Sequence, residues 1–181
     1  MESDPRPSQG SAADPVAGAL DGPADVPLEE ATVLPGAALA HLDVDDAEAV
    51  LRALSARLLE LGAVTDSFEQ AVLERERRQP TGLPTLVPAA IPHTDPEHVL
   101  TAGFAVATLE HSVPFAEIGS NGSREVEAEL VVMLVLKDPA AQLEALQNLV
   151  AKLQDRSGVR DVLTAADDAE LERAAREWLG S

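Results

Sequence analysis

The stretch AELVVMLVL, residues 128–136, is apolar at every position except Glu129, and it constrains the fold more than any other part of the sequence. A strand with one face in water alternates apolar and polar side chains, whereas a strand covered on both faces is apolar throughout. Residues 128–136 therefore predict a buried strand with further layers of structure on both sides of its sheet.

Other segments favour strands of the same sheet. TLVPAAI (85–91) leads directly into Pro92 and His93, and TAGFAVATL (101–109) has the alternation of a strand. From about residue 37, AALAHLDVDD is a short mixed stretch that could hold another strand.

The first helix is expected in AEAVLRALSARLLELGAV, residues 47–64. Asp45 or Asp46 can cap its start, and Gly62 is a typical C-terminal signal. Its apolar side chains recur at helical spacing. The expected buried face consists of Val50, Leu51, Leu54, Leu58 and Leu61.

A second helix is expected in FEQAVLERERR (68–78), with Asp66 or Ser67 as its cap. It should stop before Pro80, because a residue that precedes proline is driven out of helical geometry.

Two further helices follow the long apolar strand. The third begins with Asp138 as cap and Pro139 in the first turn, the positions that these residues prefer. Its expected buried stripe consists of Leu143, Leu146, Leu149, Val150 and Leu153. The last helix spans roughly 167–179. Together these elements predict an α/β fold: a three-layer sandwich in which a mixed β-sheet is flanked by helices on both faces.

The first 28 residues differ from the rest of the chain. They are rich in Pro, Gly, Ser, Ala and Asp and have no sustained apolar period, so they bury too little surface to offset the entropy of ordering. We expect residues 1–28 to form a disordered acidic leader and residues 29–181 to form one domain.

Composition excludes several classes of function. The chain has no cysteine, which excludes disulfides and thiolate chemistry. A formal net charge of -19 repels phosphate backbones, so no binding of nucleic acid is expected. No apolar stretch reaches the roughly 18 residues of a membrane span, and the N-terminus lacks a secretory signal. We therefore expect a cytoplasmic protein that does not insert into the membrane.

Histidine is the strongest candidate for chemistry. The four histidines, at positions 41, 93, 98 and 111, have spacings that fit no zinc signature. The sequence has neither a GxSxG serine motif nor a GxxxxGK phosphate loop. No metal and no cofactor are expected, and a histidine would serve as nucleophile or proton carrier.

The run LERERRQPTGLPTLVPAAIPHTDPEHV, residues 73–99, contains three short motifs: Arg75-Glu76, Thr81-Gly82 and Ile91-Pro92-His93. With these motifs the chain resembles the enzyme IIA domain of the fructose and mannitol group in the bacterial phosphoenolpyruvate-dependent sugar phosphotransferase system. The resemblance continues through residues 130–163, which are similar to the last strand of that family and its following helix, and it covers about residues 38–179.

One position departs from the mannitol-type members, which have a second histidine near the start of the helix after the last strand. This chain has Gln142 there. In that respect it resembles the galactitol-type branch. A glutamine can form hydrogen bonds but cannot carry a proton as histidine does.

The resemblance implies that His93 accepts a phosphoryl group from the histidine-containing phosphocarrier protein and passes it to enzyme IIB for uptake of a galactitol-like polyol or a hexose. A neutral imidazole, with a pKa near 6.5, is a competent nucleophile near neutral pH. The implied partners of the phosphate are Arg75 for its charge, Gln142 for a hydrogen bond and Thr81 as a hydroxyl donor.

Less specific interpretations stand beside this one. A domain of this fold could instead be regulatory and signal through phosphorylation of His93, or it could be an interaction domain without catalysis. Arg75 could belong to a solvated helix end. His98 and His111, in loop or turn surroundings, are expected to be solvated, and His41 is expected to be structural.

Overall fold

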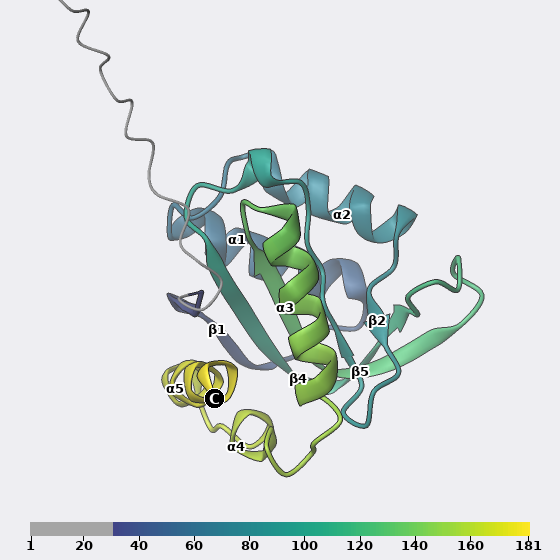
Figure 1. The fold of residues 1–181 in the computed structure, drawn as a ribbon, viewed down its shortest axis with the longest axis vertical. Helices are drawn as coiled ribbons and strands as arrows, with labels where there is room; N and C mark the ends of the chain where they lie inside the picture. The colour runs from purple at the N-terminus through teal and green to yellow at the C-terminus, as the bar shows by residue number, and fades with distance from the viewer. Residues whose placement is uncertain (1–30) are drawn as a thin grey trace, which may run out of the picture.

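The computed structural model describes residues 31–181, so the leader predicted over residues 1–28 lies outside the described residues. Five strands form one sheet in the order β1-β4-β5-β3-β2 (Figure 1). Their bounds are Val33–Leu42 for β1, Gly82–Leu83 for β2, Ala89–Ala90 for β3, Gly103–Ala116 for β4 and Glu125–Val135 for β5. Strand β1 is parallel to β4 and β3 is parallel to β5, whereas β4 with β5 and β2 with β3 are antiparallel. The predicted mixed sheet is confirmed.

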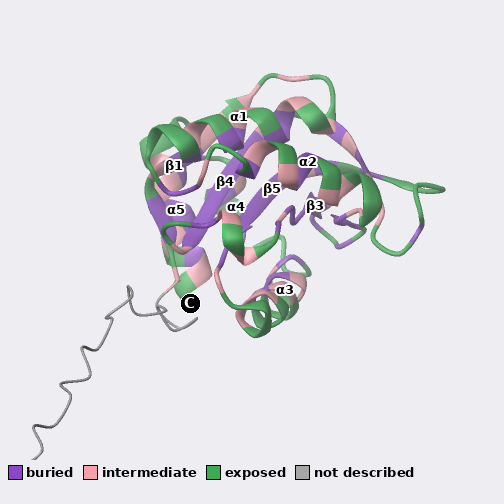
Figure 2. Cartoon of the chain, turned by 90° about the horizontal axis from the view of Figure 1, so that it is seen from above, coloured by how far each residue is buried: buried purple, intermediate pink, exposed green. Residues whose placement is uncertain are grey.

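Helices cover both faces of this sheet, as predicted. Their bounds are Ala47–Glu60 for α1, Phe68–Arg78 for α2, Pro139–Lys152 for α3, Arg160–Leu163 for α4 and Asp168–Gly180 for α5. In the view of Figure 2, the buried strands β4 and β5 lie between α1 and α3. No helix within residues 31–181 is long and apolar enough to span a membrane.

Strand β5 explains why the sandwich has two cores. Leu130, Val132 and Leu134 belong to the apolar cluster under α3, α4 and α5. Val131 and Met133 alternate with them and belong to the cluster under α1 and α2. Successive side chains of a strand point to opposite faces, so a continuous apolar run supplies both cores.

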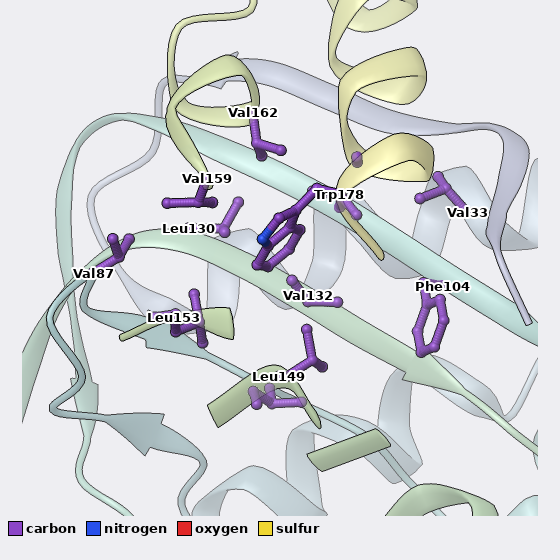
Figure 3. Packing of buried hydrophobic residues seen from close by; sticks show 14 of the residues in the cluster. Val33, Val87, Phe104, Leu130, Val132, Leu149, Leu153, Val159, Val162 and Trp178 are labelled. Carbon is purple, nitrogen blue, oxygen red and sulfur yellow. The ribbon is translucent and has the colours of Figure 1, made fainter. Parts of the chain in front are cut away.

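The single tryptophan of the chain, Trp178, packs in the core under α3, α4 and α5. Figure 3 shows the indole of Trp178, from α5, among Leu130, Val132 and Val162.

Three helices begin where an aspartate accepts a backbone hydrogen bond: Asp46 from Ala49 at 2.8 Å, Asp138 from Ala140 at 3.0 Å and Asp167 from Glu170 at 2.8 Å. These caps satisfy N–H groups that have no partner within the helix.

The continuous strand predicted over residues 85–91 is wrong. Within that span only the two-residue strand β3 forms, and β2 precedes it at Gly82–Leu83, because Pro84, Pro88 and Pro92 recur every four residues and each lacks the N–H that a ladder requires. The strand expected over 101–109 continues instead to Ala116, with an irregularity between Thr108 and Val113.

Other boundaries and faces also differ from the prediction. Strand β1 begins at Val33 and not near residue 37. Leu61 and Leu143, both expected on buried faces, are 42% and 57% exposed. Leu61 follows the last residue of α1 and Leu143 lies away from the sheet, while Leu149 and Leu153 carry the packing of α3. The short helix α4 is not predicted by the sequence pattern.

Candidate functional site

His93 follows the short strand β3 and remains paired with the long strand β5. The N–H of Leu134 donates to the carbonyl of Pro92 at 2.9 Å, and His93 forms a parallel bridge with Leu134. Within this segment, the Nδ1 atom of His93 lies 2.9 Å from the carbonyl oxygen of Ile91. A carbonyl only accepts, so Nδ1 carries the proton of this hydrogen bond.

Arg75 approaches the other nitrogen of the same ring. It lies in the last turn of α2, and its Nη2 atom is 3.2 Å from Nε2 of His93. A guanidinium only donates, so Nε2 must present a lone pair in this contact. The two contacts agree on one tautomer, a neutral imidazole with its proton on Nδ1.

The surroundings favour this neutral form. Burial lowers the pKa of His93 below its ordinary value of 6.5, and the positive charge of Arg75 lowers it further. The hydrogen bond to Ile91 and the carboxylate of Asp95 act in the opposite direction, but the pKa remains lowered. The cost of burying a charged ring therefore keeps Nε2 available as a nucleophile at neutral pH.

The cation of Arg75 is only partly neutralised. Its Nη1 atom lies 3.8 Å from a carboxylate oxygen of Asp95, and the arginine side chain is 25% exposed. Its Nε atom is buried and has no hydrogen-bond partner among the described residues. Arg75 thus retains capacity to bind an anion that reaches His93.

Arg75, Thr81 and His93 line a common cleft of about 340 Å³. Ile118 and Asn121, from the loop between β4 and β5, also line this cleft, as do Arg78 and Leu146. A larger cavity of about 410 Å³ lies against α4 and α5 and contains none of the residues that the sequence singles out. The cleft beside His93 combines the candidate nucleophile with the cation of Arg75.

Thr81 lies in the cleft wall, but its hydroxyl already has a partner. The hydroxyl donates to Oε2 of Glu76 at 2.9 Å, and the backbone N–H of Thr81 donates to Oε1 at 2.9 Å. Burial raises the pKa of Glu76 above its ordinary value. The two hydrogen bonds from Thr81 act in the opposite direction, but the pKa remains raised. Donation from Thr81 to a phosphate stays a prediction, and it would require the hydroxyl to leave Glu76.

Gln142 lies in the first turn of α3 and is not among the residues that line the cleft. Its Nε2 atom donates to the carbonyl of Thr94 at 3.1 Å and to that of Leu136 at 3.3 Å. It therefore holds the backbone of the residue that follows His93. A direct hydrogen bond from Gln142 to a phosphate also stays a prediction.

Sequence reasoning misses several features of the site. Glu76 stands in a motif but is given no role, although it bonds Thr81, and Asp95, Ile118 and Asn121 are not singled out at all. The SNGS turn (120–123) contains Asn121 at a positive φ of 52°, which is a turn signal but gives no indication that the turn lies beside His93.

The remaining histidines lie elsewhere. The Nε2 atom of His41 lies 2.8 Å from the carbonyl of Ala165, which agrees with the structural role expected. His98 is only 17% exposed, with Nδ1 2.7 Å from the hydroxyl of Ser67, so the expectation that it is solvated is wrong. His111 is 73% exposed as expected, although it lies within β4 and not in a loop. Among residues 31–181, no group of three or more His, Asp or Glu is arranged to hold a metal ion.

Comparison with known families gives a match over residues 36–177. The matching family is described as the phosphoenolpyruvate-dependent sugar phosphotransferase system, EIIA 2. The galactitol-specific EIIA component of this system from Escherichia coli (strain K12) is 30% identical over 120 residues, which cover 66% of this chain and 79% of that protein.

Solved structures share the fold. The IIA mannitol protein from Escherichia coli is 21% identical and has a TM-score of 0.64, with 80% of this chain and 99% of that chain covered. A second structure, also from Escherichia coli, is the complex of enzyme IIA mannitol with phosphorylated enzyme IIB mannitol. Its matching chain is 20% identical with a TM-score of 0.63, and the match covers 80% of this chain and 96% of that chain. Likeness at this level of identity establishes the three-layer fold.

Proposed function

This chain belongs to the EIIA 2 family of the phosphoenolpyruvate-dependent sugar phosphotransferase system, and we propose that it carries a phosphoryl group on Nε2 of His93. The observation that supports this most directly is the pair of contacts on the imidazole. Ile91 holds the proton on Nδ1, and the guanidinium of Arg75 lies at the Nε2 lone pair. A nucleophile and a cation for the incoming phosphate thus lie side by side.

The proposed step is a single displacement at phosphorus. The Nε2 lone pair of His93 forms the new N–P bond while the bond from phosphorus to the donor nitrogen breaks, and its electron pair stays with the donor. Phosphoryl transfer depends mainly on alignment and on stabilising the charge of the oxygens. Arg75 would exchange its contact with Nε2 for contacts with those oxygens.

The proposed donor is the histidine-containing phosphocarrier protein, and the proposed acceptor is enzyme IIB. The family supports this order of transfer, and the related mannitol IIA chain has been solved with phosphorylated enzyme IIB. Within the proposal, the chain acts in the cytoplasm. Its sugar is a galactitol-like polyol or a hexose, because Gln142 and the 30% identity to a galactitol-specific component favour the galactitol-type branch.

Three further assignments belong to the same proposal. Thr81 and Gln142 assist from the periphery, through a hydroxyl near the phosphate and through the backbone next to His93. Residues 29–181 make up the phosphocarrier domain, since β1 begins at Val33 and the family match at residue 36. A chain that starts at residue 29 should then accept phosphate at the rate of the whole chain, and a slower rate would extend the domain into residues 1–28.

The deciding experiment mixes the chain with phosphoenolpyruvate, enzyme I and the phosphocarrier protein. We expect an acid-labile, base-stable phosphate on His93. No label, with the donor proteins shown to be active, would contradict the phosphocarrier function and favour a non-catalytic interaction domain. Label that reaches enzyme IIB and then a sugar supports transport, whereas label that no enzyme IIB accepts would favour a regulatory domain.

A further inference from the structure

The carboxyl group of Glu76 is a partly buried acidic group that the proposed reaction does not use. It follows Arg75 in the last turn of α2. Both of its oxygens accept from Thr81: Oε1 from the backbone N–H and Oε2 from the hydroxyl, each at 2.9 Å. These two hydrogen bonds join the end of α2 to the chain that enters β2, across Gln79 and Pro80.

From Thr81 the contacts lead to the nucleophile. The carbonyl of Thr81 accepts the N–H of Ile91 at 3.3 Å, and the carbonyl of Ile91 accepts the Nδ1 proton of His93 at 2.9 Å. Glu76 is therefore connected to the imidazole through three hydrogen bonds in series and two short stretches of backbone. Its neighbour Arg75 reaches the same ring directly, at Nε2.

Thr81 cannot shift easily, because Gly82 after it is tightly enclosed. A Cβ atom at Gly82 would lie 2.6 Å from the carbonyl oxygen of Ala116, closer than real contacts allow. The carbonyl of Gly82 also accepts the N–H of Ile118 at 2.8 Å, and Ile118 lines the cleft beside His93. Thr81 thus lies where α2, the strand segment of His93 and the loop between β4 and β5 meet.

Adjacent positions on the helix explain how two neighbouring residues serve one site. Successive residues of an α-helix are rotated by roughly 100°, so Arg75 and Glu76 leave the helix in different directions. One side chain reaches His93 and the other reaches Thr81. Fixing Glu76 on Thr81 therefore fixes the rotation of the last turn of α2, and with it the direction of Arg75.

We propose that Glu76 is a positioning residue: bound to Thr81, it holds the guanidinium of Arg75 and the imidazole of His93 in register. Its effect on phosphoryl transfer rests on the proposed function, whereas its effect on the imidazole does not. Glu74, two residues earlier on the same helix, provides a matched control, because it is exposed and, within residues 31–181, its carboxylate bonds only to Gln70 of the same helix.

The test compares full-length variants by two readouts. Glu76→Gln keeps the size of the side chain but turns an NH₂ group toward one of the two Thr81 donors. Thr81→Val removes the hydroxyl donor, and Thr81→Ser retains it. For each variant, nitrogen NMR shifts report which ring nitrogen of His93 carries the proton, and single-turnover kinetics with phosphorylated donor report the maximal transfer rate and the half-saturating donor concentration.

We expect Glu76→Gln and Thr81→Val to mix the two tautomers of His93. They should lower the maximal transfer rate on the order of 10-fold to 100-fold, a cost typical of misplaced reacting groups, with an unchanged half-saturating concentration. Glu74→Gln should match the unmodified chain, and Thr81→Ser, which keeps the hydroxyl that bonds Glu76, should lose much less of the transfer rate than Thr81→Val. The double variant Glu76→Gln/Thr81→Val should be no slower than the slower single variant, because both changes break one contact.

Unchanged nitrogen shifts and rates in Glu76→Gln would overturn the proposal. So would equal losses in Thr81→Ser and Thr81→Val, since the hydroxyl would then be irrelevant. If Glu76→Gln does not fold, the comparison of the two Thr81 variants decides the question. If even the unmodified chain accepts no phosphate, the proposed function fails, and the nitrogen shifts still determine whether Glu76 orients His93.

Discussion

The Nη2 atom of Arg75 lies 3.2 Å from the Nε2 atom of His93, so the guanidinium occupies the lone pair that a phosphoryl group would take. The two residues are separated by the end of α2 and four prolines, yet the fold brings them into hydrogen-bond distance. An incoming phosphoryl group would replace this contact with one between Arg75 and the phosphoryl oxygens. The cation then remains next to the ring before and after transfer.

The first prediction concerns the nitrogen that carries the phosphate. Because Nδ1 is committed to the Ile91 carbonyl, we expect phosphorylation at Nε2 alone. The ³¹P–¹⁵N couplings of the phosphorylated chain distinguish the two nitrogens. His93→Ala should abolish labelling without loss of secondary structure. Label at Nδ1 would contradict the prediction, because the imidazole would then have to break its hydrogen bond to Ile91 and rotate before it reacts.

The second prediction concerns the shape of the cation. Arg75→Lys keeps the charge but loses the planar guanidinium that binds two phosphate oxygens at once. We expect transfer to slow on the order of 10-fold to 100-fold while the melting temperature changes little. Arg77→Lys is the matched control, since Arg77 on the same helix pairs with Glu48 of α1. Equal transfer rates in the two variants would mean that Arg75 is only a solvated residue at the end of the helix.

The third prediction follows from the lowered pKa of His93. In the unfolded chain this ring titrates near 6.5, and in the folded chain burial lowers the pKa below that value. Between the two values the unfolded state binds more protons, so falling pH should destabilise the fold there until the folded ring is protonated as well. Phosphate acceptance should accordingly persist below pH 6.5 and decline only as the folded ring gains its proton.

Titration of the His93 ring by NMR and denaturant unfolding across this pH range measure both effects. His93→Gln should lack the His93 contribution to the loss of stability. A folded pKa at or above 6.5 would contradict the prediction, because the ring would then be substantially charged near neutral pH.

Much of the fold could be predicted because its signals are local or periodic. The apolar run of residues 130–136 requires coverage on both faces, and Asp138 with Pro139 marks the start of a helix whatever surrounds it. The prolines at 84, 88 and 92 are also present in the sequence, but their combined effect, which reduces the strand expected over residues 85–91 to β3, depends on which N–H groups the neighbouring strands need.

The geometry of the site depends on contacts that no local pattern encodes. The segment ERERR by itself favours a solvated helix end, and Arg77 does behave in that way. Arg75 and Glu76 differ from it only because the turn after the helix returns the chain, which places Thr81 against one side chain and His93 against the other. The residue types at the site were predictable, whereas their partners required the fold.

The fourth prediction concerns the effect on stability of a side chain at Gly82. Gly82→Ala should destabilise the chain by about 1–3 kcal/mol, because the new Cβ would overlap the backbone of β4 at Ala116. Gly180→Ala, at a position with open space around the Cα atom, should have little effect. Denaturant unfolding of both variants gives the comparison, and equal stabilities would mean that β4 moves aside without cost.

The last prediction separates two roles for Gln142. Its Nε2 atom donates to the carbonyls of Thr94 and Leu136, so Gln142→Glu would place a carboxylate oxygen against two acceptors. We expect this change to cost about 1–3 kcal/mol of stability, because buried acceptors lose their donor. Gln147→Glu, on the exposed side of the same helix, should leave stability nearly unchanged.

Gln142→Leu then distinguishes support of the backbone from direct contact with phosphate. If Gln142 acts by holding Thr94, the leucine variant should lose stability and transfer rate together, since the segment that carries His93 is released on one side. If the amide instead turns to the phosphate, the transfer rate should fall while the melting temperature of the unphosphorylated chain is retained. Measuring both quantities on both variants assigns the role, and the hydrogen bonds to Thr94 and Leu136 favour the first outcome.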